Sequence, residues 1–261
     1  MKNEIIIADP AKNITVFVLN DVENRVEAAK HLLCDPSLRA EQVGFVIPPK
    51  EPHEFWRLEM MGGEFCANAS RSFALFVARK IGLSGNADVM IETSGMKNPL
   101  KVKVNVETGN AEIDITKPTA VTSLDFNGIT VPVYIFDGIT HIIAAGINAE
   151  KEIFFSLKTL LEKNMKSPQA LGVMFYDKSK DLMIPAVYVY ETETLIFESS
   201  CGSGSAALGL WKNEKLNDGE GFCSVNQKGG IIEVKVTKSN GTVTSLSIGG
   251  TVSLSKKMFI E

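Results

Sequence analysis

Two short segments that lie half a chain apart each place a cysteine before small residues and then continue into an apolar stretch. The first is residues 64–70, Glu-Phe-Cys-Ala-Asn-Ala-Ser, and the second is residues 198–205, Glu-Ser-Ser-Cys-Gly-Ser-Gly-Ser. The repetition predicts two similar halves that each offer one thiol, Cys66 or Cys201, to a shared cleft. Two facing thiols could act on one carbon from opposite sides, because a thiolate can remove a proton on one face while a thiol returns one on the other.

The start of a helix is a suitable place for such a thiol. The unpaired amide groups there carry a partial positive charge, which lowers the pKa of a thiol and attracts a carboxylate. Small residues at this point let a ligand approach the backbone closely. This arrangement favours removal of the α-proton of an amino acid, because amides aimed at its carboxylate would stabilise the carbanion. A single cysteine before a helix is more often a small buried hydrophobic residue. The prediction of a catalytic pair therefore rests on the repetition of the segment.

Apolar periodicity indicates the elements that must position these segments. Alternating residues predict strands in both halves, at 14–18, 42–47, 89–92 and 100–106, and at 131–136, 142–145, 172–176, 184–190, 231–238 and 242–248. Turn residues predict hairpins at Thr108-Gly109-Asn110 and Ser239-Asn240-Gly241. Helical spacing predicts helices over 21–33, capped by Asp21, and over about 150–163.

Two further helices begin at the cysteine segments, over about 68–80 and 203–213, and both are apolar nearly all round. All-round apolarity favours a helix that is buried inside a sheet. The predicted fold class is therefore α+β, with two pseudo-symmetric lobes that each wrap a mixed or antiparallel, barrel-like sheet around a central α-helix. We expect an N-terminal lobe over 1–116, to which a C-terminal strand at about 251–261 returns, and a C-terminal lobe over 117–250.

Composition narrows the choice of partner and compartment. The chain has 261 residues, of which 44% are hydrophobic and 22% are charged. Its formal net charge is −4, so it has no excess of basic residues that would favour binding to nucleic acid or anionic lipid. The N-terminus lacks the pattern of a signal peptide, and no apolar run approaches the length of a membrane span. We expect a cytoplasmic protein with reduced cysteines, a small-molecule amino-acid substrate, no nucleic acid or membrane partner, and a homodimer as a possible assembly.

The cysteine segments also carry a resemblance to a known family. Residues 66–74, Cys-Ala-Asn-Ala-Ser-Arg-Ser-Phe-Ala, resemble the motif Cys-Gly-Asn-Gly-Ala-Arg-Cys-Phe-Ala of the cofactor-independent amino-acid racemases and epimerases built like diaminopimelate epimerase. Residues 201–207, Cys-Gly-Ser-Gly-Ser-Ala-Ala, resemble that family's second motif, and the match covers most of the chain. The resemblance implies two catalytic cysteines and no cofactor. The residues it implies at the site are catalytic Cys66 and Cys201, with Ala67, Asn68, Gly202 and Ser203 binding the substrate.

Four positions outside these motifs also resemble the family. The stretch at 12–18 implies a substrate contact for Asn13, and Gln42-Val43 implies one for Gln42. His141 and Glu191 match a His and a Glu that help to orient or polarise the second thiol, with Glu193 as the rival for the Glu. On their own, Asn13 and Gln42 are more often polar loop or strand-end residues, His141 can be a satisfied core histidine, and the glutamates can lie on a solvated strand edge.

The departures from the family pattern bear on the substrate. Diaminopimelate epimerase carries Glu-Arg shortly before its second cysteine, and its Arg serves the far carboxylate of the substrate. The stretch at 190–194, Tyr-Glu-Thr-Glu-Thr, has no Arg, and the family's Gly-Asn-Pro-His is here Gly138-Ile139-Thr140-His141. Because Arg is a strong reader of carboxylates, its absence counts against diaminopimelate. The chain most resembles the histidine racemases of this superfamily, which implies interconversion of L- and D-histidine.

Alternative functions remain at this point. The chain could be a diaminopimelate epimerase, a racemase of another amino acid, another isomerase or a dehydratase on the same scaffold, or a thiol switch that forms a disulfide. A pyridoxal-dependent racemase is the mechanistic rival, although no lysine stands in an identifying context. Cys34 and Cys223 are predicted to be packing residues. His31 and His53 have no partners at metal-ligand spacing, so no metal site is expected.

Overall fold

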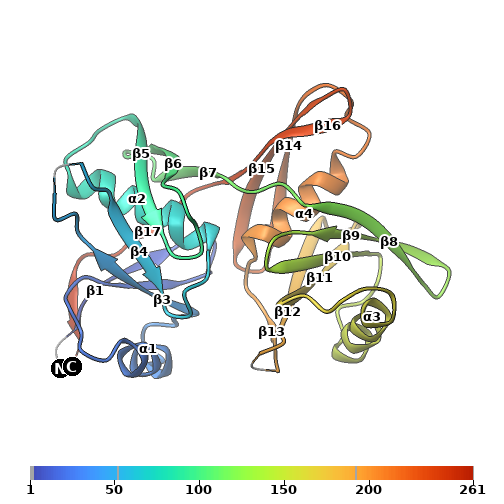
Figure 1. Cartoon of the computed structure of the whole chain (residues 1–261), viewed down its shortest axis with the longest axis horizontal. Coiled ribbons are helices and arrows are strands. Elements are labelled where there is room, and N and C mark those ends of the chain that lie inside the picture. The colour runs from blue at the N-terminus through green and yellow to red at the C-terminus, as the bar shows by residue number, and fades with distance from the viewer. Residues whose placement is uncertain (1–2, 52, 192, 261) are drawn as a thin grey trace. The chain divides into compact units, whose positions relative to one another are not determined.

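The computed structural model describes residues 3–51, 53–191 and 193–260 of the chain. The chain divides into two compact units, one of Met1–Asp114 with Gly249–Glu261 and the other of Ile115–Ile248. Figure 1 shows the elements of each unit, coloured from blue at the N-terminus to red at the C-terminus. The last segment of the chain thus belongs to the first unit.

The first unit is built on one mixed sheet that closes on itself. Strand β1 pairs with β2 on one side and with β17 and β18 on the other, and the order continues through β3, β4, β5 and β6 to β7. Backbone bonds from Ala111 N to Gly250 O (3.2 Å) and from Val252 N to Gly109 O (2.9 Å) join β7 to the segment before β17. The strands are β1 (Asn3–Asp9), β2 (Thr15–Val18), β3 (Gln42–Ile47), β4 (Trp56–Met60), β5 (Asn86–Thr93), β6 (Leu100–Asn105), β7 (Asn110–Asp114), β17 (Ser253–Leu254) and β18 (Met258–Ile260).

Helix α2 (Ala67–Lys80) lies inside this sheet (Figure 1). It contacts β1, β4, β5, β6, β7 and β17, and every residue from Ala67 to Ala78 is buried. Each fully buried Phe or Leu, such as Phe73 and Leu75, stabilises the unit by about 1.5–3 kcal/mol. The all-round apolar sequence of this helix is therefore explained by a sheet that surrounds it.

The second unit has a sheet of its own. Pairing runs from β8 through β9, β10, β11 and β12, and β12 pairs both with β13 and, in parallel, with β14, which pairs with β15. Its strands are β8 (Ala120–Phe126), β9 (Ile129–Ile135), β10 (Ile139–Ala145), β11 (Ala170–Asp177), β12 (Leu182–Val189), β13 (Thr194–Phe197), β14 (Gly219–Gln227), β15 (Gly230–Ser239) and β16 (Thr242–Gly249). Helix α4 (Gly202–Lys212) contacts β10, β11, β14 and β15, and most of its residues are buried.

The two units repeat one sequence of pairings. In the first unit a parallel pair β2–β3, connected by helix α1 (Arg25–Cys34), is followed by the antiparallel pair β3–β4 and the parallel pair β4–β5, connected by α2. In the second unit β10–β11, connected by helix α3 (Lys151–Asn164), is followed by β11–β12 and by β12–β14, connected through α4. The predicted α+β fold with pseudo-symmetric, β-rich lobes and a central helix in each is confirmed.

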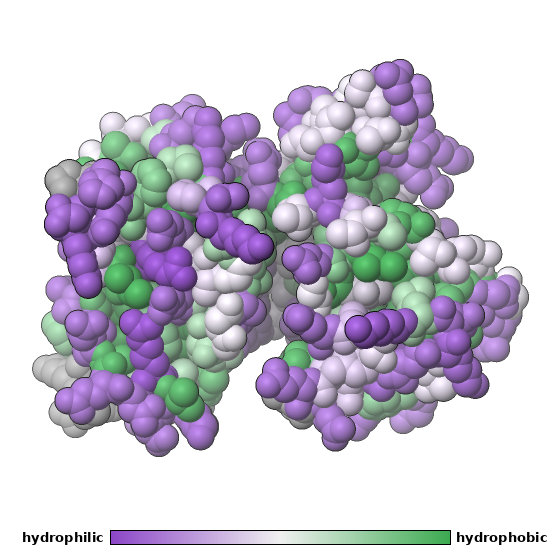
Figure 2. Space-filling view, viewed as in Figure 1, coloured by the Kyte–Doolittle hydropathy of each residue, from purple (hydrophilic) through white to green (hydrophobic). Residues whose placement is uncertain are grey.

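Most predicted elements are present, with one correction. Helix α1 begins at Arg25 and not at Asp21, because Asn24 is the residue whose side chain accepts a hydrogen bond from the Glu27 amide. Both predicted hairpins form, and the turn at Asn240-Gly241 has positive φ at both residues. Hydrophilic residues spread over the face of each unit in Figure 2, with small apolar patches between them, as expected when the apolar helices are enclosed.

Candidate active site

Cys66 is the N-cap residue of α2. Its backbone is extended (φ −123°, ψ 113°), and its Sγ accepts a hydrogen bond from the Ala69 amide at 3.5 Å. The N-cap is usually Ser, Thr, Asp or Asn, whose oxygen satisfies one of the free amides of the first helical turn. A thiolate at this position receives the amide hydrogen bond and the positive end of the helix dipole together.

Cys201 occupies the same position at the start of α4. Its backbone angles, φ −130° and ψ 119°, are close to those of Cys66, and its Sγ accepts from the Gly204 amide at 3.4 Å. Its side chain is buried, at 7% exposed. The two cysteines singled out in the sequence therefore share one local geometry in two separate units.

A network of buried side chains surrounds the first turn of α2. Asn68 donates to the side-chain oxygen of Asn13 (3.3 Å) and accepts from Nε of Arg71 (3.1 Å). Asn13 in turn donates to Glu41 (2.9 Å), and Arg71 donates to the Gly250 carbonyl (2.8 Å). The structure thus brings two predicted binding residues, Asn13 and Asn68, into direct contact with each other.

Gln42 is the first residue of β3, beside the same region of the first unit. Its side-chain oxygen accepts from the Thr15 hydroxyl at 3.5 Å, and Thr15 is also its strand partner. Its amide donates to the Ile14 carbonyl at 3.1 Å. Gln42 and Asn13 are therefore attached to the same short segment, because both lie next to the start of β2.

A chain of polar groups leads away from the second thiol. The Ser203 hydroxyl lies 3.6 Å from Sγ of Cys201 and 2.9 Å from Nε2 of His141, which projects from β10. His141 is fully buried, and burial lowers its pKa to about 3, so the imidazole is neutral at neutral pH. The structure brings His141 to the second thiol through Ser203.

Room for the His141 ring is provided by Gly172 on the neighbouring strand β11. A Cβ at Gly172 would lie 2.2 Å from Nδ1 of His141, so any side chain there would displace the ring. Among the described residues, Nδ1 of His141 has no hydrogen-bond partner. A buried acceptor is left unpaired more often than a buried N–H. We therefore place the proton on Nε2, from where it is donated to Ser203.

Glu198 is the carboxylate in contact with Cys201. Burial raises the pKa of the Cys201 thiol well above its usual range, and the charge of Glu198 and its hydrogen bond to the thiol raise it further. The Gly204 amide and the Ser203 hydroxyl act in the opposite direction but are weaker than burial. Cys201 is therefore protonated at neutral pH in this structure.

Glu191, assigned beside the second thiol by resemblance, lies elsewhere. It is exposed in the turn between β12 and β13, and its rival Glu193 is exposed in the same turn. Strand β13 runs back along β12, with Thr194 opposite Val189 and Phe197 opposite Ala186, so this turn and Cys201 are at opposite ends of β13. The structure favours Glu198 over Glu191. A carboxylate three residues before the cysteine was the available signal.

Gln227 at the end of β14 is a second residue that the sequence did not indicate. Its side-chain oxygen accepts from the Cys201 amide at 2.8 Å, and its nitrogen donates to the Ser205 hydroxyl at 3.0 Å. Ser205 completes the ring by donating to the Cys201 carbonyl at 2.6 Å. This ring fixes the backbone of Cys201 on both sides.

The remaining cysteines lie in different surroundings. Cys34 is exposed at the end of α1, which contradicts the prediction that it packs in the core, and Cys223 lies half-buried on β14. Within residues 3–51, 53–191 and 193–260, no group of three or more His, Cys, Asp or Glu side chains could hold a metal ion. None of the helices in this part of the chain has both the length and the apolarity to cross a bilayer.

Comparison with solved structures defines the fold class. The chain shares its fold with a predicted epimerase from Pseudomonas aeruginosa (TM-score 0.63, 11% identity, 99% of each chain covered). It also shares it with a hydroxyproline epimerase from Agrobacterium vitis that has trans-4-OH-L-proline bound (TM-score 0.62, 11% identity, 99% of this chain and 92% of that chain). The structure therefore has the two-lobed fold found among epimerases.

Comparison of sequences defines the family. Residues 4–257 match the family described as "Histidine racemase CntK N-terminal domain". A histidine racemase of Fusobacterium nucleatum is 36% identical over 225 residues, 82% of each chain, and one of Staphylococcus aureus is 24% identical over 270 residues, 97% of this chain and 96% of the relative. The chain belongs to the histidine racemase family, a family of isomerases, and the resemblance stated from its motifs is confirmed.

Proposed function

We propose that this protein interconverts L- and D-histidine by moving the α-proton between Cys66 and Cys201 without a cofactor. The observation that carries the proposal is the duplicated N-cap cysteine, with similar backbone angles and the same kind of amide-to-sulfur hydrogen bond at the starts of α2 and α4. The curated relatives named histidine racemase support the choice of substrate. A small-molecule amino acid is thus the proposed partner.

The proposed reaction is a proton transfer through a carbanion. The thiolate of one cysteine takes the α-proton, and the electron pair of the broken C–H bond spreads into the carboxylate. The thiol of the other cysteine then gives its proton to the opposite face of the carbon, so the product is the mirror image and the two sulfurs have exchanged protonation states. No oxidant, reductant or group donor is needed.

The backbone at the two helix starts supplies the electrostatic part of this mechanism. Free amides of α2 and α4, at Ala67, Asn68, Gly202 and Ser203, would hold the substrate carboxylate and stabilise the charge that enters it. Asn13 and Gln42 would contact the substrate from the first unit. The small side chains at Ala67 and Gly202 leave space for this approach.

Cys201 would enter the cycle as the acid. Its raised pKa keeps it protonated, and the neutral His141 can stabilise the thiolate that forms on proton donation by directing the Ser203 hydroxyl at the sulfur. His141 is thus proposed as a supporting residue, and Glu198 takes the supporting role that resemblance gave to Glu191. Because both thiols must stay reduced to act, the cytoplasm is the proposed compartment.

The test is chiral chromatography of each histidine enantiomer incubated with the purified protein in ²H₂O. We expect the opposite enantiomer to form, with deuterium at its α-carbon, in protein that shows no cofactor absorbance. Cys66→Ser and Cys201→Ser should each reduce the rate by at least about a hundredfold, because each removes one of the two acid–base groups. Cys34→Ser and Cys223→Ser are the matched controls and should keep the wild-type rate.

Several results would contradict the proposal. Full racemisation by either the Cys66 or the Cys201 variant would exclude the two-thiol mechanism. Turnover of another amino acid, with none of histidine, would replace the substrate but keep the mechanism. An absence of α-proton exchange across a panel of amino acids, together with turnover of another acid, would favour a different isomerase on this fold.

A further inference from the structure

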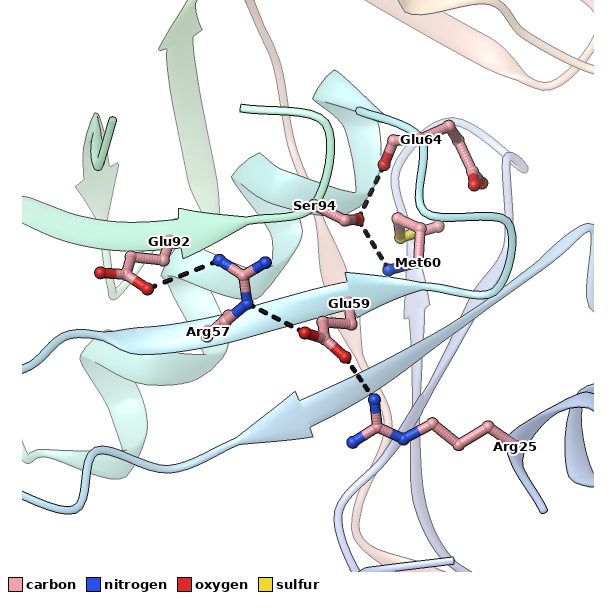
Figure 3. Close-up of polar contacts among 7 residues, drawn as sticks. All are labelled: Arg25, Arg57, Glu59, Met60, Glu64, Glu92 and Ser94. Atoms are coloured by element: carbon pink, nitrogen blue, oxygen red, sulfur yellow. Dashed lines mark hydrogen bonds and ion pairs between the residues drawn. The ribbon is translucent and has the colours of Figure 1, made fainter. Parts of the chain in front are cut away.

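The backbone on the N-terminal side of Cys66 is attached to Ser94, the residue that follows β5 (Figure 3). The Ser94 hydroxyl accepts from the Met60 amide at 2.9 Å and donates to the Glu64 carbonyl at 2.8 Å. Met60 and Glu64 flank the exposed loop of residues 61–63, and Ser94 itself is only 6% exposed. One buried hydroxyl therefore joins the two ends of the loop that leads into Cys66.

Gly95 brings the same turn close to the backbone of the loop. Its φ is +73°, and a Cβ built there would lie 2.4 Å from the Phe65 amide nitrogen and 2.9 Å from the Glu64 carbonyl carbon. Any side chain at this position would push away the backbone immediately before Cys66. Glycine is therefore required both by the conformation and by the close approach.

The backbone on the C-terminal side of Cys66 is attached to the same turn. The Ser70 hydroxyl, in the first turn of α2, donates to the Thr93 hydroxyl at 3.4 Å, and both side chains are buried. The Ser70 amide also donates to the Cys66 carbonyl at 2.9 Å. The three consecutive residues Thr93, Ser94 and Gly95 thus hold the chain before and after Cys66.

We propose that Thr93, Ser94 and Gly95, which we call the β5 clamp, position the Cys66 sulfur for proton transfer. This inference rests on the proposed function, because it concerns the same thiol. Proton transfer depends steeply on the geometry of the donor and acceptor, and a displacement of about 1 Å can reduce a rate about a hundredfold. Ser94 is a positioning residue, since it acts on the reacting sulfur through the backbone of residues 64–66.

The sheet around the β5 clamp is also held together by ion pairs and backbone hydrogen bonds that do not involve the Ser94 hydroxyl. On the outer face, Glu59 of β4 accepts from Arg57 (3.1 Å) and pairs with Arg25 of α1, and Arg57 also pairs with Glu92 of β5 at 3.5 Å (Figure 3). The backbone ladder joins β4 to β5 as well, from Trp56 opposite Ile91 to Leu58 opposite Thr93. Removal of the Ser94 hydroxyl should therefore loosen the loop while the sheet stays assembled.

Ser255 offers a matched control in the same unit. Its hydroxyl also accepts from one backbone amide, that of Ile7 at 2.9 Å, and donates to one carbonyl, that of Lys256 at 2.8 Å. Ser255 joins the C-terminal segment to β1. Ser94→Ala and Ser255→Ala therefore each remove a hydroxyl that accepts from one amide and donates to one carbonyl, at a buried position for Ser94 and a more exposed one for Ser255.

The kinetic test measures kcat and KM for both histidine enantiomers and the isotope effect with α-deuterated substrate. We expect Ser94→Ala to lower kcat about 10- to 100-fold, to change KM less than about threefold, and to increase the isotope effect, because proton transfer becomes more limiting. Ser94→Thr should recover most of the rate, because it keeps the hydroxyl. Ser255→Ala should keep the wild-type kcat. An unchanged kcat in Ser94→Ala, or an equal fall in Ser255→Ala, would overturn the proposal.

A second measurement does not depend on racemisation. Alkylation of Cys66 by iodoacetamide, followed by peptide mass spectrometry across a pH series, reports the thiolate fraction at this residue. In Ser94→Ala the sulfur should lose its fixed distance to the Ala69 amide, and the midpoint of alkylation should move to higher pH, while Ser255→Ala keeps the wild-type midpoint. An unmoved midpoint in Ser94→Ala would count against the clamp. Thr93→Val serves the same comparison if Ser94→Ala does not fold.

The two experiments separate the failure of the clamp from the failure of the proposed function. If the wild-type protein does not racemise histidine but the Cys66 midpoint moves in Ser94→Ala, the proposed function fails and the clamp stands. If the wild-type protein racemises histidine and Ser94→Ala changes neither kcat nor the midpoint, the clamp fails alone.

Discussion

At the scale of single residues, the second thiol shows how burial and hydrogen bonds oppose each other. A helix N-terminus alone would lower the pKa of a thiol, which was the expectation from the sequence. At Cys201 burial and the Glu198 carboxylate dominate, and they raise the pKa of the thiol instead. The position in the helix is thus not enough to decide the protonation state of a cysteine, and the surrounding charges have to be known.

Glu198→Gln should lower the pKa of Cys201. The amide removes the negative charge that disfavours the thiolate, while the Gly204 amide and the Ser203 hydroxyl still favour it. The measurement is the pH dependence of Cys201 alkylation, read at its own peptide, and we expect the midpoint to fall by about one unit or less for a partly screened charge. A fall in Glu191→Gln with none in Glu198→Gln would restore the assignment made by resemblance.

At the scale of elements, the start of α4 packs closely against β11 because Gly204 has no side chain. A Cβ at Gly204 would lie 2.1 Å from Sδ of Met174 and 3.2 Å from Sγ of Cys201, and Met174 is fully buried. The same methionine lies near Gly172, where a Cβ would be 2.8 Å from its Cε. The glycines near the second thiol thus make room for a core side chain.

Gly204→Ala should therefore destabilise the protein by about 1–3 kcal/mol, the usual cost of an overpacked core. Met174→Ala alone should also destabilise it, since it leaves a cavity. In the double variant the two costs should partly cancel, giving a coupling free energy of about 1 kcal/mol or more in a double-mutant cycle. Urea unfolding of the four proteins provides the values. Strictly additive effects would show that Met174 does not set the requirement for glycine.

Local sequence patterns predicted the helices that are buried on all sides. They failed for features whose position depends on which strands pair. The helices α2 and α4 were predictable because a helix that is apolar on all sides has few alternatives to enclosure. The strand β1 was not predicted, since it is stabilised in part by partners distant in sequence, β17 and β18. The place of Glu191 depended on the β12–β13 hairpin, whose register no short motif contains.

The candidate site was predictable to a similar extent. The duplicated cysteines and Asn68 follow from motifs, because they belong to continuous segments that end at a helix start. Gln227 and Ser94 reach the cysteine segments from other strands, and their side-chain types are common on strands and turns. Only the fold brings them to the backbone of these segments.

At the scale of the whole molecule, the fully buried His141 couples folding to pH. Burial lowers its pKa to about 3 in the folded state, whereas an unfolded chain has an ordinary histidine pKa of about 6.5. Between these two values the unfolded state binds a proton at this residue and the folded state does not. The free energy of unfolding should therefore rise with pH across this window, and it should fall on acidification from pH 6.5 towards pH 3.

The two tryptophans make this dependence measurable in one unit. Trp211 lies in α4 of the second unit and Trp56 in β4 of the first, so a Trp56→Phe background leaves fluorescence that reports only on the unit containing His141. In this background, the unfolding free energy with His141 should fall by up to about 1.4 kcal/mol per pH unit below pH 6.5 relative to His141→Asn, which cannot titrate there. Acidic groups titrate in both proteins, so their contribution cancels in the difference. Parallel curves for the two proteins between pH 6.5 and 4.5 would mean that His141 is charged or hydrated in the folded state. That result would also remove the neutral imidazole on which the proposed chain from His141 through Ser203 to Cys201 depends.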